Sequence, residues 1–112
     1  MAKLITVTIE PGQEVMATLE QKFAELNIKE GAIVSVIGAV DECCISNMPK
    51  NNPKQDVFNE YKEPFEMSGT GEIQKGRPHI HCVMSRIGES TLAGHLHWAK
   101  VESWYVRVFL LV

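Results

Sequence analysis

The stretch GRPHIHCVMSRIGESTLAGHLH, residues 76–97, contains all four histidines of the 112-residue chain. They form two His-x-His pairs, His79 with His81 and His95 with His97. Three interpretations fit such a pattern: a metal site, an acid–base centre, or a polar and solvated face of a hairpin. Which of them applies depends on how the two pairs lie relative to one another.

The two pairs lie on either side of a turn signal at Gly88 and Glu89. Residues on both sides alternate between apolar and polar types, which is typical of strands, and a glycine between two such runs is typical of a hairpin turn. The sequence therefore predicts two antiparallel strands, 78–86 and 91–99.

The register of this hairpin decides which histidines share a face. Within a strand, residues i and i+2 point to the same side, so each pair projects together. A loop of even length places His95 opposite Cys82, on the face away from His81. A loop of odd length, or a bulge, places His95 on the face of His79 and His81. Gly94 is a candidate bulge position, because glycine tolerates positive φ. A metal site therefore requires an odd loop or a bulge.

Three converging histidines would suit a divalent ion such as zinc. Imidazole is the commonest metal ligand, and three histidines leave one tetrahedral position open for water or substrate. Such an ion polarises a carbonyl group or lowers the pKa of water, which would permit hydrolytic or lyase-type chemistry. Glu72, Glu89 and Arg77 are the nearest candidates for acid–base or anion contacts, although charged residues near turns are usually solvated.

Cupins are a familiar alternative for a His-x-His pair. Their motif continues with a glutamate ligand three or four residues after the second histidine. The five residues that follow His81 are Cys82, Val83, Met84, Ser85 and Arg86. None is a carboxylate, so the sequence argues against a cupin.

The rest of the chain predicts an α+β domain of about six or seven mostly antiparallel strands, with one amphipathic helix packed on the sheet. The helix is predicted over residues 13–26, where Val15, Leu19, Phe23 and Leu26 form one apolar stripe. Further strands are predicted at 3–9, 32–40, 43–48, 65–73 and 103–112.

Four local features add to this prediction. Gly31 is a candidate stop for the helix. Gly38, inside a strand, indicates a bulge or a close approach of backbones. Segment 49–64 is polar, with three prolines and three asparagines, and is predicted as a long loop. Residues 104–111 are apolar on both faces, so we expect one face to lie against the helix and the other against another layer or subunit.

Charge argues against a direct nucleic-acid partner. The net charge is −3, and the eleven Lys and Arg are scattered without a run. A free-standing nucleic-acid binder should carry a basic patch. A length of 112 residues predicts one domain, 1–112.

The cysteines and the apolar segments point to a cytoplasmic protein. Cys43, Cys44 and Cys82 form neither a Cys-x-x-Cys motif nor a framework for disulfides. No segment has the composition of a signal peptide, and none approaches the ~20 apolar residues that a membrane span needs. We expect reduced thiols and no membrane association.

The order of these segments resembles the plant and prokaryote conserved (PPC) domain family, in its free-standing prokaryotic form. The resemblance covers nearly the whole chain. It rests on EPGQE at residues 10–14, then SVIGAVDECCIS, FEMSGTGEI, GRPHIHCVMS and GESTLAGHL. Its specific part is Gly-x-Pro-His-x-His followed later by Gly-His-Leu.

This resemblance implies a homotrimer and, as in some free-standing members, a metal ion, commonly zinc, on the histidines of the motif. Carried over, the ligands are His79, His81 and His95. His97 is not a regular part of the pattern, and Cys43 with Cys44 is expected to be structural. Plant members bind DNA through an AT-hook, Arg-Gly-Arg-Pro, which this chain does not have. Prokaryotic relatives are often described as candidate DNA-binding proteins.

Two hypotheses follow. In the first, the chain is a metal-binding homotrimer, with a small-molecule ligand and hydrolytic or lyase-type chemistry in a cleft between subunits. In the second, it is a non-catalytic assembly or regulatory module with structural histidines, presenting a surface to a protein or to DNA.

Overall fold

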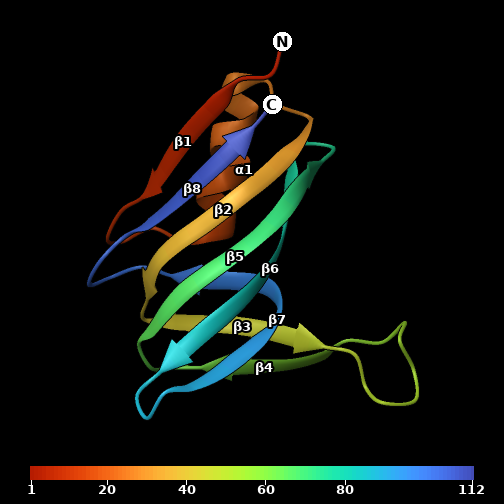
Figure 1. Ribbon diagram of the computed structural model, residues 1–112, viewed down its shortest axis with the longest axis vertical. Coiled ribbons are helices and arrows are strands. Elements are labelled where there is room, and N and C mark those ends of the chain that lie inside the picture. The colour runs from red at the N-terminus through yellow and green to blue at the C-terminus, as the bar shows by residue number, and fades with distance from the viewer.

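The computed structural model describes residues 1–112 as one helix and eight strands (Figure 1). The elements are β1 Leu4–Ile9, α1 Val15–Leu26, β2 Glu30–Val40, β3 Glu42–Asn47, β4 Val57–Tyr61, β5 Phe65–Gln74, β6 Arg77–Arg86, β7 Ser90–Lys100 and β8 Val106–Leu111. All strands belong to one antiparallel sheet, in the order β1-β8-β2-β5-β6-β7-β3-β4. The predicted α+β class is confirmed. α1, with twelve residues, is too short to cross a bilayer.

The predicted count of six or seven strands is wrong. The additional strand is β4, which lies inside the segment 49–64 that the sequence predicts as a loop. β4 is an edge strand that pairs only with β3, and its residues Val57–Glu60 are all exposed. An edge strand without a buried face has no alternation of apolar and polar residues, so its sequence carries no strand signal. The last strand is also shorter than predicted, because it begins at Val106.

The helix is tied to the sheet by its N-terminal cap. The carboxylate of Glu14 accepts hydrogen bonds from the amides of Met16 and Ala17, both at 2.8 Å, and also from the amide of Ala99 on β7, at 2.9 Å. The helix ends at Asn27, whose φ of 54° lies in the left-handed region. Gly31, the predicted stop, belongs to β2 instead. Asparagine tolerates this conformation better than most residues, which explains the earlier end.

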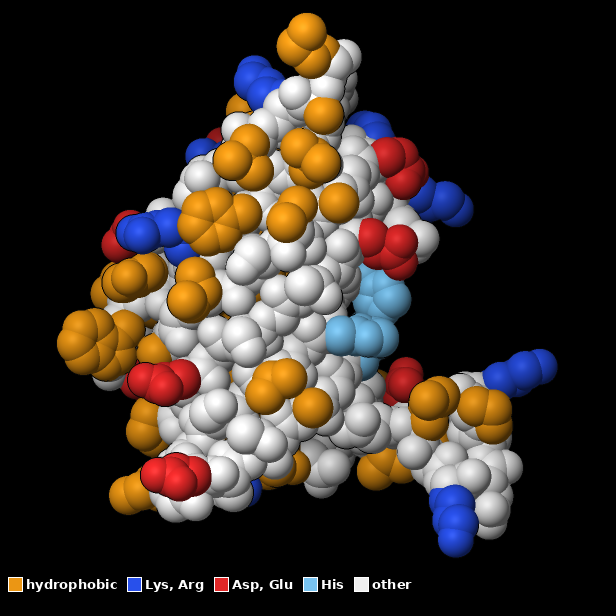
Figure 2. Space-filling view, viewed as in Figure 1, with side chains coloured by type: hydrophobic (Ala, Val, Ile, Leu, Met, Phe, Trp, Pro, Cys, Tyr) orange, Lys and Arg blue, Asp and Glu red, His pale blue; other side chains and the backbone are white.

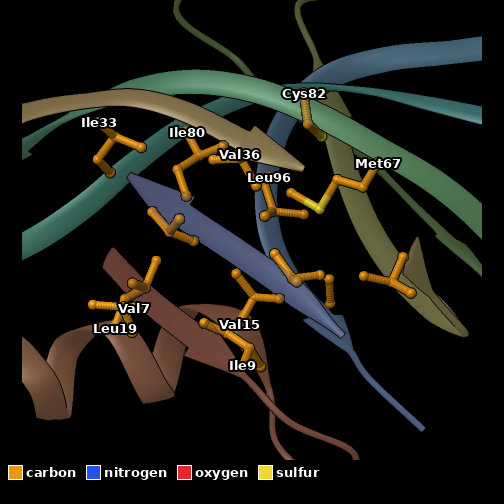
Figure 3. Close-up of a cluster of buried hydrophobic side chains, with 14 of the residues drawn as sticks. Val7, Ile9, Val15, Leu19, Ile33, Val36, Met67, Ile80, Cys82 and Leu96 are labelled. Carbon is orange, nitrogen blue, oxygen red and sulfur yellow. The ribbon is translucent and has the colours of Figure 1, made fainter. Parts of the chain in front are cut away.

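The core fills the space between α1 and the inner face of the sheet (Figure 3). Val15, Leu19 and Phe23 of the helix are fully buried, as the apolar stripe predicts, whereas Leu26, the fourth residue of the predicted stripe, is exposed at the end of the helix. Burying each such side chain contributes about 1.5–3 kcal/mol. Ile80, Cys82 and Met84 of β6 belong to the same core, so His81 and Val83, which alternate with them, point outward.

The hairpin of β6 and β7 has an odd loop. Arg86 pairs with Ser90, which leaves the three residues Ile87–Glu89 in the turn. The Glu89 amide donates to the Arg86 carbonyl oxygen at 3.2 Å, and φ is 84° at Gly88. His81 then lies directly opposite His95. The register that a metal site requires is therefore present.

Two glycines predicted as bulge positions serve close approaches between strands. A Cβ on Gly94 would lie 2.5 Å from the Ile45 side chain and 2.6 Å from the Ser46 carbonyl oxygen, both on β3. A Cβ on Gly38 would overlap the backbone of Tyr105, so this close approach is confirmed. The bulges of the sheet lie elsewhere, in β2 after Ile33 and where β7 pairs with β3.

The outer face of the sheet carries an exposed apolar surface. β8 buries Val106, Val108 and Leu110 completely, whereas Leu111 on its other face is 42% exposed. This apolar outer surface lies over β1, β8 and β2 (Figure 2) and consists of the exposed Leu4, Val34, Ile37 and Leu111 with the half-buried Phe109. Within one chain, only one of the two faces predicted to be covered is covered.

Replacing Gly71 by alanine should destabilise the fold by about 3 kcal/mol, the upper range for overpacking. A Cβ there would overlap the His79 carbonyl oxygen, a backbone atom that cannot move without shifting β6. Urea unfolding would measure the loss. Ser68→Ala, at an exposed position of the same strand, should change stability by less than about 0.5 kcal/mol. Equal stability of the two variants would contradict this packing argument.

Candidate metal centre

Three histidines meet on the outer face of the sheet. His81 of β6 lies opposite His95 of β7, and His79 precedes His81 by two residues on the same face. The cross-strand row continues to Thr70 on β5 and to Ser46 on β3. Histidine side chains are visible in Figure 2 at the right-hand margin of the view, on the same face of the molecule as exposed hydrophobic side chains.

The ring nitrogens of His79, His81 and His95 are close enough to share one ion. The atoms that could bind a metal all lie within 4.8 Å of one another. In tetrahedral zinc sites with Zn–N bonds of 2.0–2.1 Å, two nitrogens lie ~3.4 Å apart. Small side-chain rotations would close this difference, and His81 is exposed and free to make them. The structure therefore brings together the three residues that the sequence nominates.

The donor set fits a divalent transition ion. His79 Nδ1 lies 3.0 Å from Glu72 Oε2, so the carboxylate accepts the Nδ1 proton and leaves Nε2 free to bind. The side chains of His81 and His95 make no hydrogen bond to the protein, so their nitrogens are also available. Burial lowers the pKa of His95, and the neighbouring histidines add to this shift. The neutral imidazole, which is the form that binds metal, is thereby favoured.

His97 does not join this cluster. Cys44 pairs with Trp98 and Ile45 with Leu96, so β7 has one extra residue, His97, at a bulge. His97 Nε2 lies 2.6 Å from Ser46 Oγ instead. The sequence leaves the role of His97 open, because nothing in it places a bulge at this position.

The other charged candidates separate into two groups. Glu72 contacts a histidine, as described, and Arg77 lines a polar hollow together with Lys75 and His79. Glu89 lies in the hairpin turn at the opposite end of β6, away from the histidines. Only Glu72 and Arg77 are thus placed to act at this site.

A hollow of about 890 Å³ adjoins His81 and His95. Its floor is the outer face of β5, β6 and β7, and its far wall is the loop between β3 and β4, which extends from the sheet in Figure 1. The lining includes Ser68, Thr70, Val83, Ala93, Met48, Pro53 and Asp56. The loop predicted from its prolines therefore borders the site, although the sequence alone does not indicate on which face it lies.

Whole-chain comparisons place the fold among known proteins. Residues 1–112 match the Plants and Prokaryotes Conserved (PCC) domain family. No protein with a curated description matches the sequence.

Three solved structures are similar along almost the whole chain. A metal-containing protein from Archaeoglobus fulgidus is 29% identical, with a TM-score of 0.81 over 97% of this chain and 78% of that one. A plant- and prokaryote-conserved protein from Pyrococcus horikoshii is 18% identical, with a TM-score of 0.86 over 97% and 77%. A candidate DNA-binding protein from Bacteroides thetaiotaomicron is 25% identical, with a TM-score of 0.80 over 96% and 76%.

The three cysteines are free thiols, and all three are buried. They are therefore not candidate ligands for an ion held by the histidines on the outer face. Burial, with a smaller contribution from neighbouring negative charge, raises the pKa of Cys43 to about 12. Burial also raises the pKa of Cys82 to about 11 and raises that of Cys44. The thiolate is the reactive and metal-binding form, so these groups are inert near neutral pH.

We expect no cysteine of the folded protein to react with a chromogenic disulfide reagent within minutes at pH 8. At Cys82 only about one thiol in a thousand would be ionised at that pH, burial raises the pKa of Cys43 and Cys44 as well, and all three side chains are buried. In urea, three thiols per chain should react at once. A thiol that reacts rapidly without urea would show that at least one cysteine is accessible.

Proposed function

Because the chain belongs to the Plants and Prokaryotes Conserved domain family, we propose that it binds one divalent ion, zinc, through His79, His81 and His95. The observation that carries the proposal is the convergence of their ring nitrogens within 4.8 Å on one sheet face. The similarity to a metal-containing protein, at 29% identity, supports it. A site in which His97 is a fourth ligand has less support, because the Nε2 atom of His97 is already hydrogen-bonded to Ser46 Oγ.

The residues around the three histidines suit a site with one open position. Glu72 orients His79 through Nδ1, and Thr70 lies opposite His81 beside the hollow. The hollow has room for a small molecule, and Arg77 could contact an anionic group on the side of His79. A zinc ion with an open position supplies Lewis acidity for hydrolytic or lyase-type reactions. We propose this class of chemistry for the site.

We also propose that the chain assembles as a homotrimer through its apolar outer surface. Contiguous exposed apolar side chains on a soluble protein mark interaction sites, and a domain of this size gains stability from burying them. A cross-strand row runs from Leu4 through Leu111, Ala32 and Glu72 to His79. The apolar outer surface and the histidines therefore share one sheet face, which supports a site close to a subunit contact.

The same apolar outer surface favours a second candidate function, an assembly or regulatory module without chemistry. In that case the histidines would be structural, and the partner would be a protein or DNA. The net charge of −3 gives the DNA version little electrostatic support. Binding to generic duplex DNA that weakens with salt would favour it, and absence of binding at low salt would exclude it.

Elemental analysis of untagged protein, purified without added metal, should find about one zinc per chain. His81→Ala should lose this metal, because two histidines bind zinc far more weakly than three. Since His81 is exposed, the fold should lose less than about 0.5 kcal/mol and the oligomer should persist. Thr91→Ala, at an exposed position of β7 outside the cluster, is the matched control and should keep the metal.

Two results would contradict the metal proposal. One is a protein that is purified without metal and does not bind added zinc. The other is stoichiometric zinc in His81→Ala. Either result would turn the search toward partners of a structural module.

Sedimentation should show a trimer that Leu111→Glu converts to monomer. A carboxylate in the middle of the apolar outer surface would be buried without a partner in the assembly, which is strongly unfavourable. The control variant Thr91→Glu, at a position outside this surface, should leave the trimer intact. A monomeric parent protein at micromolar concentration would overturn this part of the proposal.

A further inference from the structure

His97 is the one histidine that the proposed site does not use, yet it makes three specific contacts. Its ring stacks on that of His95, with centroids 4.6 Å apart and an interplanar angle of 3°. It also packs against Phe58 of β4, with ring centroids 4.5 Å apart. Its Nε2 atom lies 2.6 Å from Ser46 Oγ. A ring held by one contact from its own strand and by two from the neighbouring strands β3 and β4 is unlike a solvated surface histidine.

A bulge of β7 lies at this position. Without an extra residue at position 97, the register of β7 with β3 would continue unchanged beyond Leu96. His95 and His97 are two residues apart and share one side of the strand, and the His97 ring lies beside that of His95 and reaches the hydroxyl of Ser46. Ser46 is 1% exposed and lies directly opposite His95 in the sheet. Bulges commonly re-aim a side chain next to a functional site.

We propose that His97 is a positioning residue, which holds the His95 ring in the orientation that binds zinc. This inference rests on the proposed zinc site. His95 makes no hydrogen bond to the protein, so nothing fixes its ring through a nitrogen. The parallel stack fixes the plane of the ring instead, while both nitrogens stay free. Phe58 and Ser46 in turn hold His97 in place.

The three proposed ligands differ in how neighbouring side chains orient their rings. His79 is oriented by a hydrogen bond to Glu72, and His95 by a stacked ring. His81 is exposed, so its ring can adjust to an ion that the other two have already placed. Partners that orient metal ligands commonly change metal affinity by about 10- to 100-fold when they are removed.

The test compares two substitutions at position 97. His97→Ala removes both the stacked ring and the nitrogen, and should weaken zinc binding about 10- to 100-fold. His97→Phe keeps a flat ring in the stack but has no nitrogen, and should bind zinc within about threefold of the parent if stacking matters and ligation does not. Competition with a chromophoric zinc chelator measures both affinities, and Thr91→Ala is the control.

Three outcomes would contradict the inference. If His97→Ala binds zinc as tightly as the parent, His97 does not position His95. If His97→Phe loses as much affinity as His97→Ala, the nitrogen of His97 is needed, and His97 acts as a direct ligand. If Thr91→Ala loses as much zinc affinity as His97→Ala, the loss reflects general damage to β7, and the positioning role of His97 is contradicted.

A second measurement does not depend on zinc binding. It also keeps the inference testable if His97→Ala fails to fold. In zinc-free protein, the stacked ring of His97 should shift the NMR signals of the His95 ring protons. Ser46→Ala removes only the hydroxyl, and should reduce this shift while the fold is kept. An unchanged shift in Ser46→Ala and His97→Ala would overturn the positioning role. A parent protein that binds no zinc but shows the shift would refute the proposed function and leave the stacking intact.

Discussion

The three-residue turn between β6 and β7 is the constraint on which the rest of the site depends. The side-chain period of a strand is two, so a loop shorter or longer by one residue would move His95 to the other face. It would then point into the core opposite Cys82, where an imidazole without a partner is costly, and the apolar Leu96 would be turned outward. The core and the turn thus specify the same register. The convergence of His79, His81 and His95 is a consequence of that agreement.

The two faces of the sheet have different roles. The inner face and α1 bury an apolar core, and the Glu14 cap joins the helix to β7 by a hydrogen bond to Ala99. The outer face is left for histidines, hydroxyl groups and the apolar outer surface. Because one cross-strand row connects Leu111 to His79, anything that covers the apolar outer surface approaches the histidines as well.

Much of this arrangement is predictable from local patterns. The spacing of Val15, Leu19 and Phe23 indicates the helix and its buried stripe, and the alternation in residues 78–86 indicates which side chains of β6 point outward. Both hold because period and burial are properties of short segments. Patterns fail where a residue has no buried face or serves a distant contact. The exposed strand β4 is missed, and Gly94 accommodates β3 instead of forming a bulge.

By itself, the sequence determined the α+β class, the helix and the hairpin, and its resemblance to a known family gave the three candidate ligands His79, His81 and His95. It left the register open between two alternatives, because a glycine-containing turn is compatible with several loop lengths. Only the tertiary structure decided that the loop has three residues, that Glu72 contacts His79, and that the ring of His97 stacks on that of His95. These features depend on which strands lie side by side. Strand neighbours are set by packing of the whole sheet, and no short segment encodes them.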